Sequence, residues 1–211
     1  MIKWTISPAY FSDADLLNEY DELKTTLQYS NWQSNHRINA IVAELKLRGK
    51  SRITSQPLMQ TDNFTISSDM TASEQFTALN ERYAGEKRGR LALPKRADVL
   101  WRQHKYAIMA RSIALYKSVG KSVAANRDSE LFNALCTTLT DELFKRPKTV
   151  AIYNVLQHMW GYISDFSTIK KADVNALGCR DLLSEIQSSA LSSNQPYLSE
   201  QVALSELQIW L

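Results

Sequence analysis

The sequence has few of the residues that bind metals or form disulfides. It contains two cysteines, Cys136 and Cys179, without a Cys-x-x-Cys pair, and three scattered histidines, His36, His104 and His158. Metal sites in proteins need several such ligands brought together at a defined spacing. We therefore expect no metal and no cofactor, and we interpret the cysteines as buried thiols of a protein in a reducing compartment.

Long apolar runs are also missing. No window approaches the roughly eighteen consecutive apolar residues that span a bilayer. The first residues, MIKWTISPAYF, contain no basic segment followed by an apolar one, as a secretory signal would. These absences predict a cytoplasmic location and no membrane partner. With 211 residues, 44% of them hydrophobic, the chain can still bury a substantial core.

Apolar residues recur at helical spacing along nearly the whole chain, which predicts an all-α fold. Polar pairs such as Ser12 with Asp13 are typical of helix starts, and Gly49 is typical of a helix end. Residues 63–67 alternate as a lone strand would. The first predicted helix starts at Ser12 or Asp13, and the second ends at Arg48. A third covers 73–84, a fourth starts at Ala97 or Asp98, a fifth follows Ser112, and a sixth runs from Asp128 to before Pro147. The last three cover 149–166 with Gly161 inside, cover 171–190, and follow Gln195.

The composition divides the chain into three parts. Residues 1–52 contain two predicted helices, residues 53–80 are rich in Ser, Thr, Gln and Asp, and residues 81–211 contain most of the remaining helices. We predict a small N-terminal helical pair, a polar linker and a larger helical domain. A basic loop over residues 86–96, interrupted by glycine and proline, opens the larger domain.

Positive charge is concentrated in one segment. Residues 82–127 contain twelve Lys or Arg against two acids, whereas the segments on either side are acidic. Ordinary solvated surfaces mix charges of both signs, so the segment favours a polyanion as partner. Neither DNA nor RNA is specified, because no base-reading motif is present. The predicted nucleic-acid-binding residues are Lys87, Arg88, Arg90, Lys95, Arg96, Arg102, Lys105, Arg111, Lys117 and Lys121.

Two separated motifs occur in the same region. They are Trp101-Arg102-Gln103-His104-Lys105-Tyr106, continuing to Met109-Ala110-Arg111-Ser112 with Tyr116 and Gly120, and Val155-Leu156-x-His158-x-x-Gly161-Tyr162. With them, about residues 83–211 resemble the YbgA-like domain, a helical family of unknown function. The family occurs alone or fused to thiouracil-desulfurase-like domains, so the resemblance implies a link to tRNA or thiolated bases. The sequence departs from the family pattern near the C-terminus, where Ser205-Glu206-Leu207-Gln208 replaces a basic segment of the family.

The motif residues also have simpler interpretations. His104 lies on the apolar side of its helix, so it is either a buried, hydrogen-bonded histidine or a ligand-contacting one. His158, next to Gly161 and Tyr162, can be a device for helix packing. The aromatic residues are either core residues or platforms on which bases stack. These aromatic residues are Trp101, Tyr106 and Trp160.

A second resemblance covers about 50 residues at the N-terminus. Its motifs are Asp13-x-x-Leu16-x-x-Glu19-Tyr20-x-Glu22-Leu23 and Arg37-x-x-x-x-Val42-Ala43-Glu44-x-x-x-Arg48-Gly49. They resemble an abbreviated phage endonuclease V type of pyrimidine-dimer DNA glycosylase. The resemblance implies DNA repair chemistry by the N-terminal amine of Met1 with Glu22 as the carboxylate. Family residues that grip phosphate or start a helix are replaced here by Ile2, Asp15, Asp21 and Thr25.

The sequence thus predicts a nucleic-acid-binding protein that uses the basic surface of a YbgA-like domain, linked to DNA repair or to tRNA and thiolated bases. One alternative is a glycosylase and abasic-site lyase that uses Met1 and Glu22, for which an α-amine partly unprotonated at neutral pH is suitable. Another is a non-catalytic protein-interaction module. The oligomeric state stays open.

Overall fold

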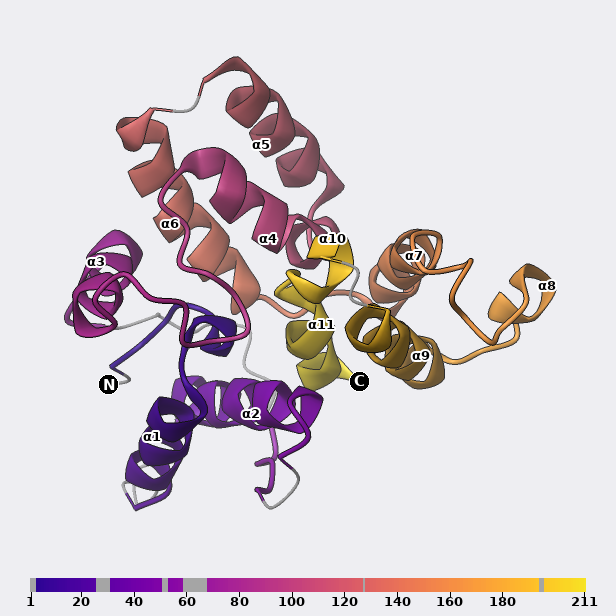
Figure 1. Cartoon of the computed structure of the whole chain (residues 1–211), viewed down its shortest axis with the longest axis horizontal. Helices are drawn as coiled ribbons and strands as arrows, with labels where there is room; N and C mark the ends of the chain where they lie inside the picture. Colours follow the sequence, from indigo (N-terminus) through magenta and orange to yellow (C-terminus); the bar gives the residue numbers. More distant parts are fainter. Residues whose placement is uncertain (1–2, 26–30, 51–52, 59–67, 127, 194–195) are drawn as a thin grey trace.

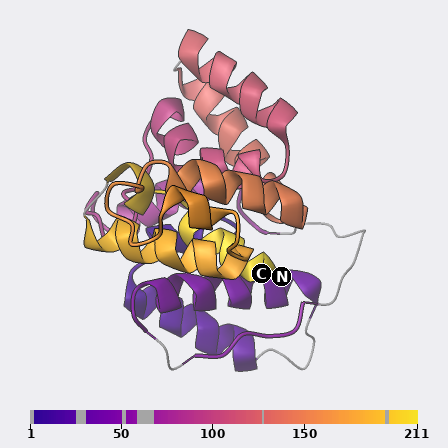
Figure 2. The same ribbon diagram turned by 90° about the vertical axis from the view of Figure 1, so that its right-hand side faces the viewer.

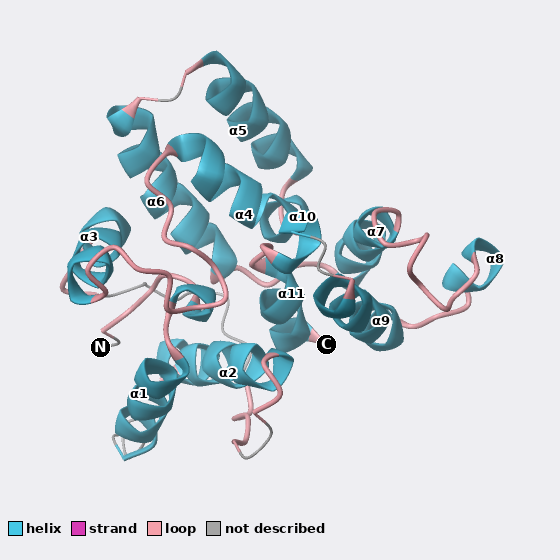
Figure 3. Cartoon of the chain, viewed as in Figure 1, coloured by secondary structure: helices cyan, strands magenta, loops and turns pink. Residues whose placement is uncertain are grey.

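The computed structural model describes residues 3–25, 31–50, 53–58, 68–126, 128–193 and 196–211. Within these ranges every regular element is a helix and no strand occurs (Figure 3). The predicted all-α fold is therefore confirmed. The strand predicted over residues 63–67 lies outside the described residues. None of the described helices has both the length and the apolar character needed to cross a membrane.

The N-terminal part forms η1 (Pro8–Tyr10), α1 (Asp13–Thr25) and α2 (Trp32–Leu47). α1 begins at Asp13, as the polar pair Ser12 and Asp13 predicts. α2 ends at Leu47, and Gly49 follows with a φ of 78°. Glycine adopts this left-handed conformation without strain, so it ends the helix where the sequence predicts.

The chain between the N-terminal helices and the basic segment contains α3 (Ala72–Arg82). Its start is fixed by a reciprocal cap, in which Thr71 and Glu74 each bond the other's backbone N–H. Phe76 and Leu79 are buried. The last part of the segment predicted as a polar linker is therefore a helix packed into the core.

Three longer helices follow, α4 (Ala97–Met109), α5 (Ile113–Ala125) and α6 (Ser129–Leu143), and α4 packs against both others (Figure 1). Ser112 caps α5 by accepting from the backbone N–H of Leu115, and Asp128 caps α6 by accepting from that of Leu131. Both caps are those the sequence predicts, because capping depends on residues within one turn of each other.

The C-terminal part is more broken than predicted. The helix expected over 149–166 ends at Trp160, and Gly161 is the residue that caps it. Residues beyond it continue in tighter turns, with Ile163 donating to the Trp160 carbonyl at 2.9 Å. The helical region expected over 171–190 is two helices separated before Gly178. The observed elements are α7 (Thr149–Trp160), α8 (Lys171–Val174), α9 (Cys179–Ser192), α10 (Pro196–Ser199), α11 (Ala203–Glu206) and η3 (Leu207–Trp210).

The predicted N-terminal pair and the larger domain share one core. α2 packs against α11 and η3, and Figures 1 and 2 both show the N-terminal helices beneath the C-terminal ones. Ile41 and Leu45 of α2 belong to the same cluster of buried side chains as Leu204 and Leu207. The two segments are therefore held together by apolar burial that the local sequence pattern does not reveal.

A buried carboxylate connects three distant segments. Glu44 of α2 pairs with Arg48 and Arg90, each with an N–O distance of 2.8 Å, and accepts a hydrogen bond from Ser205 of α11 at 2.6 Å. Burial acts to raise the pKa of Glu44, but the charges and hydrogen bonds of Arg90, Arg48 and Ser205 lower it to about 2. Glu44 is therefore ionised at neutral pH and fixes the loop at Arg90 and α11 onto α2.

Candidate nucleic-acid interface

Two of the predicted phosphate-binding residues are used inside the fold. Arg90 pairs with Glu44 and donates to the carbonyls of Ser199 and Gln201 at 2.6 and 3.0 Å. The side chain of Arg111 is 1% exposed, where it pairs with Glu206. Their guanidinium groups already have anionic and carbonyl partners, so neither residue is presented to a phosphate.

The other basic residues of the loop lie on the surface. Lys87, Arg88, Lys95 and Arg96 are exposed. Arg88 forms an ion pair with Glu86 at 2.5 Å, and Arg96 one with Asp98 at 2.6 Å. Exposed pairs of this kind are weak, so they leave these cations able to exchange a carboxylate for a phosphate.

The basic loop is fixed in place by a close backbone approach. The N–H of Leu91 donates to the carbonyl of Ala9 in η1 at 2.8 Å. A Cβ atom added at Gly89 would lie 2.4 Å from the backbone carbon of Tyr10, closer than any real contact. Glycine is therefore required at this position, and the loop is held against the N-terminal part of the chain.

Three tyrosines that are far apart in the sequence meet in the folded chain, Tyr106 of α4, Tyr162 just after α7 and Tyr197 of α10. The ring of Tyr197 lies 4.5 Å from that of Tyr162 and 6.3 Å from that of Tyr106. Its hydroxyl contacts the hydroxyls of Tyr106 and Tyr162 at 3.3 and 3.4 Å. Tyr162 is 54% exposed. We call Tyr106, Tyr162, Tyr197 and Lys105 the tyrosine cluster.

Lys105 lies within this cluster rather than in open solvent. Its ammonium group donates to the Tyr197 hydroxyl and lies 4.2 Å from the centre of the Tyr197 ring and 5.2 Å from that of Tyr106. Burial lowers the pKa of Lys105, and the charge of Arg102 acts in the same direction while Tyr162 opposes it. The cation is thus positioned by aromatic faces, as cation–π contacts favour.

Further cations and rings border the cluster. Arg102 has a half-exposed side chain and lies 3.5 Å from Glu200. The rings of Trp101 and Tyr116 have centroids 5.4 Å apart. Lys117 directly follows Tyr116 on α5, and both Lys117 and Lys121, one helical turn further on, are exposed. The result is a partly exposed set of rings on the same helices as the exposed cations Arg102, Lys117 and Lys121.

The motif residue His104 does not contribute to this surface. His104 is 2% exposed, and its Nδ1 lies 2.9 Å from the Leu100 carbonyl oxygen, which can only accept a hydrogen bond. Burial lowers the pKa of His104 to about 4, so the ring is neutral at pH 7. Of the two interpretations, the buried, hydrogen-bonded one fits. His158 is exposed on α7, and Gly161 caps that helix.

The described residues do not form the catalytic site predicted at the N-terminus. Glu22 lies exposed on α1. Met1 lies outside the described residues, so the structure does not place its amine. The motif residues Glu19 and Arg37 instead form a buried ion pair of 2.7 Å, and Arg48 joins the Glu44 network. These contacts give the N-terminal motifs a role in the packing of α1 on α2.

Sequence reasoning missed the central member of the cluster. Tyr197 contacts Lys105, Tyr106 and Tyr162, which are 92, 91 and 35 residues away. The available signal was the segment Gln195-Pro196-Tyr197-Leu198, which fits the YbgA-like resemblance but carries no charge or spacing that identifies a site. In the described part of the chain no group of three His, Cys, Asp or Glu side chains could hold a metal ion.

The fold and the cluster define an all-α protein with an aromatic and cationic surface near its C-terminal helices. Residues 105–207 match a family described as "Protein of unknown function (DUF1722)", which is the YbgA-like family. The matched residues include Lys105, Tyr106, Tyr162 and Tyr197. No curated protein and no solved structure matches the chain. The comparisons do not support the resemblance to endonuclease V.

Proposed function

We propose that the protein binds nucleic acid through the tyrosine cluster and the cations around it. The single observation that supports this most is that Lys105 and the exposed Tyr162 both contact the hydroxyl of Tyr197. Aromatic faces stack on bases of any sequence, and neighbouring cations neutralise phosphates. A cluster of both is the usual composition of a surface that follows a nucleic-acid strand.

The cluster favours unpaired bases over a duplex. Bases within a duplex are already stacked on one another, whereas the bases of a single strand can stack on a protein ring. Tyr162 is the ring of the cluster most open to such a base, because it is 54% exposed. The cluster does not favour RNA over DNA, because none of its groups is positioned specifically for a 2′-hydroxyl.

The surface cations set the expected dependence on salt. With Arg90 and Arg111 used internally, the remaining candidates are the exposed cations and Lys105 in the cluster. The exposed cations are Lys87, Arg88, Lys95, Arg96, Arg102, Lys117 and Lys121. Six phosphate contacts on a single strand give log K a slope of about −4 against log[salt]. The slope is a direct count of the contacts that form.

Fluorescence anisotropy with a labelled single-stranded oligonucleotide, as RNA and as DNA, and with the matching duplexes tests the proposal. We expect tighter binding to the single strands, weakened by salt. The double variant Arg102→Glu with Lys105→Glu should abolish this binding at moderate salt. The control Lys170→Glu with Lys171→Glu changes the net charge equally at exposed positions outside the basic segment and should retain most of the affinity.

Variants at Tyr162 distinguish base stacking from simple charge attraction. Tyr162→Ala should weaken binding by about 1–3 kcal/mol, the range measured for loss of one base-stacking ring. Tyr162→Phe removes only the hydroxyl that contacts Tyr197 and should bind nearly as well as the native protein. No binding to any of the polymers, binding insensitive to salt, or equal losses in the charge-reversal variant and its control would overturn the proposal.

A further inference from the structure

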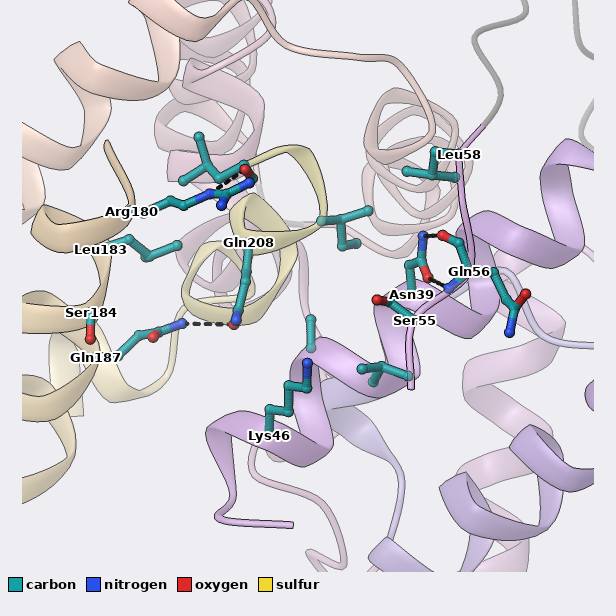
Figure 4. A pocket seen from close by; sticks show the side chains of 14 residues that line it. Asn39, Lys46, Ser55, Gln56, Leu58, Arg180, Leu183, Ser184, Gln187 and Gln208 are labelled. Atoms are coloured by element: carbon teal, nitrogen blue, oxygen red, sulfur yellow. Dashed lines mark hydrogen bonds between the residues drawn. The ribbon is translucent and has the colours of Figure 1, made fainter. Parts of the chain in front are cut away.

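A cavity of about 530 Å³ lies on another part of the molecule, where α2 faces α9 and η3 (Figure 4). Its volume falls within the range of small-molecule sites. It contains none of the residues of the tyrosine cluster. One wall is formed by α2 and the segment around Gln56, and the other by α9 and the C-terminal residues.

Hydrogen bonds hold both walls in position. The Asn39 side chain donates to the Gln56 carbonyl at 2.8 Å and accepts from the Gln56 N–H at 2.7 Å. On the opposite side, the Gln187 amide donates to the Leu204 carbonyl at 2.6 Å and to Gln208 at 3.3 Å. The cavity is therefore formed before any ligand arrives, which lowers the entropic cost of binding.

The side chains of the lining include two cations and no carboxylate. Lys46 projects from α2 and Arg180 from α9, and every other lining side chain is neutral (Figure 4). Arg180 donates to the Leu211 carbonyl, whereas Lys46 takes part in no ion pair among the described residues. The neutral lining combines an apolar part, which includes Val42 and Leu183, with hydroxyl and amide groups such as those of Ser55 and Ser184.

We propose that this cavity binds a small organic anion, a phosphate or carboxylate attached to an apolar body. Lys46 attracts the anionic group, and Val42 and Leu183 contact the apolar part. Because the lining carries no acidic side chain, a cationic ligand would find no side chain there to balance its charge. Because the walls come from the N-terminal and C-terminal parts of the chain, a bound ligand also ties these two parts together.

Saturation-transfer NMR on the full chain tests this with three probes of similar size: phenyl phosphate, benzoate and the uncharged benzyl alcohol. We expect transfer to phenyl phosphate, benzoate or both, and much weaker transfer to benzyl alcohol. The two anions distinguish a phosphate site from a carboxylate site. No transfer to either anion, or equal transfer to benzyl alcohol, would overturn the proposal.

Three variants locate the site. Lys46→Gln should weaken binding of the anion at least several-fold, while Lys171→Gln, a matched change at an exposed lysine outside the cavity, should not. Tyr162→Ala should leave the transfer signal of the anion unchanged. If the anion bound at the tyrosine cluster instead, this variant would lose the signal. An anion signal that persists in Lys46→Gln, or that disappears in Tyr162→Ala, contradicts the assignment. The result does not depend on whether the protein binds nucleic acid.

Discussion

Arg90 and Arg102 come from the same basic segment and have opposite surroundings. Arg90 lies at the junction of α2 and α11, paired with the fully buried Glu44, whereas Arg102 lies half-exposed beside the tyrosine cluster. In a buried pair, removal of one partner strands the other charge in a medium that solvates it poorly. At the surface, water and salt replace a lost partner at little cost. The same residue type therefore stabilises the fold in one region and is accessible to a ligand in the other.

The largest effect is expected at the buried junction. Glu44→Gln removes the charge that Arg48 and Arg90 share, and should lower the free energy of unfolding by about 3–5 kcal/mol. Urea denaturation followed by circular dichroism measures it. Glu86→Gln, which removes the carboxylate from the exposed pair with Arg88, is the control and should change stability by less than about 1 kcal/mol. Similar losses in both variants would remove the distinction between the two regions.

Acid should destabilise the protein below pH 6.5 because two histidines are buried and neutral. Burial, with the charges of Arg111 and Arg37, lowers the pKa of His36 to about 3, and burial lowers that of His104 to about 4. Both values lie below 6.5, so the unfolded chain binds protons that the folded chain does not. This stability is complete above pH 6.5 and is lost as the pH falls toward 4 and 3. The slope should approach about 1.4 kcal/mol per pH unit for each histidine.

Single variants show which histidine causes the dependence of stability on pH. His104→Gln should remove about half of the slope between pH 6 and 4 in urea denaturation. Asn154→Ala, which replaces a non-titrating exposed residue of α7, should leave the slope unchanged. If His104→Gln gives the native slope, then this histidine is not the group that acid protonates on unfolding.

A smaller effect is expected where the basic loop contacts η1. Gly89→Ala places a Cβ 2.4 Å from the Tyr10 backbone and should cost about 1–3 kcal/mol, because two backbone segments must separate. Gly120→Ala is the control. A Cβ there meets nothing closer than 3.8 Å and should stabilise α5 by up to about 1 kcal/mol. Thermal denaturation compares the two. A neutral Gly89→Ala would show that the loop is not fixed by this approach.

The smallest effect on stability is expected at the exposed arginine. Arg102→Ala should change the free energy of unfolding by less than about 0.5 kcal/mol while it weakens nucleic-acid binding. Arg90→Ala should do the reverse, with a large loss of stability. Denaturation and anisotropy on both variants provide the comparison. Loss of stability in Arg102→Ala would place this residue with the structural cations.

Local signals predicted the starts of the longer helices well. Ser112 and Asp128 cap α5 and α6, and Gly49 follows the end of α2, because each effect is confined to one turn of backbone. The ends were harder to predict in the C-terminal part. The apolar pattern continues through Gly161 to the buried Ile163, so periodicity did not show that the α-helix stops at Trp160.

The candidate site was predicted in part. The motif named Trp101, Tyr116 and Tyr162, and the charge count named Arg102 and Lys105, all of which lie at or beside the cluster. Charge density could not separate Arg90 and Arg111 from the exposed cations, because their acidic partners, Glu44 and Glu206, are 46 and 95 residues away. The same separation in sequence concealed Tyr197.

The sequence by itself determined the helical class, most helix starts, the concentration of positive charge and the similarity of residues 105–207 to the YbgA-like family. These properties depend on residue types and on neighbours within a few positions. Only the tertiary structure decided which cations are buried, that α2 shares a core with α11, and that three tyrosines surround Lys105. These outcomes depend on contacts between distant segments, whose energies exist only once the chain has folded and excluded water from between them.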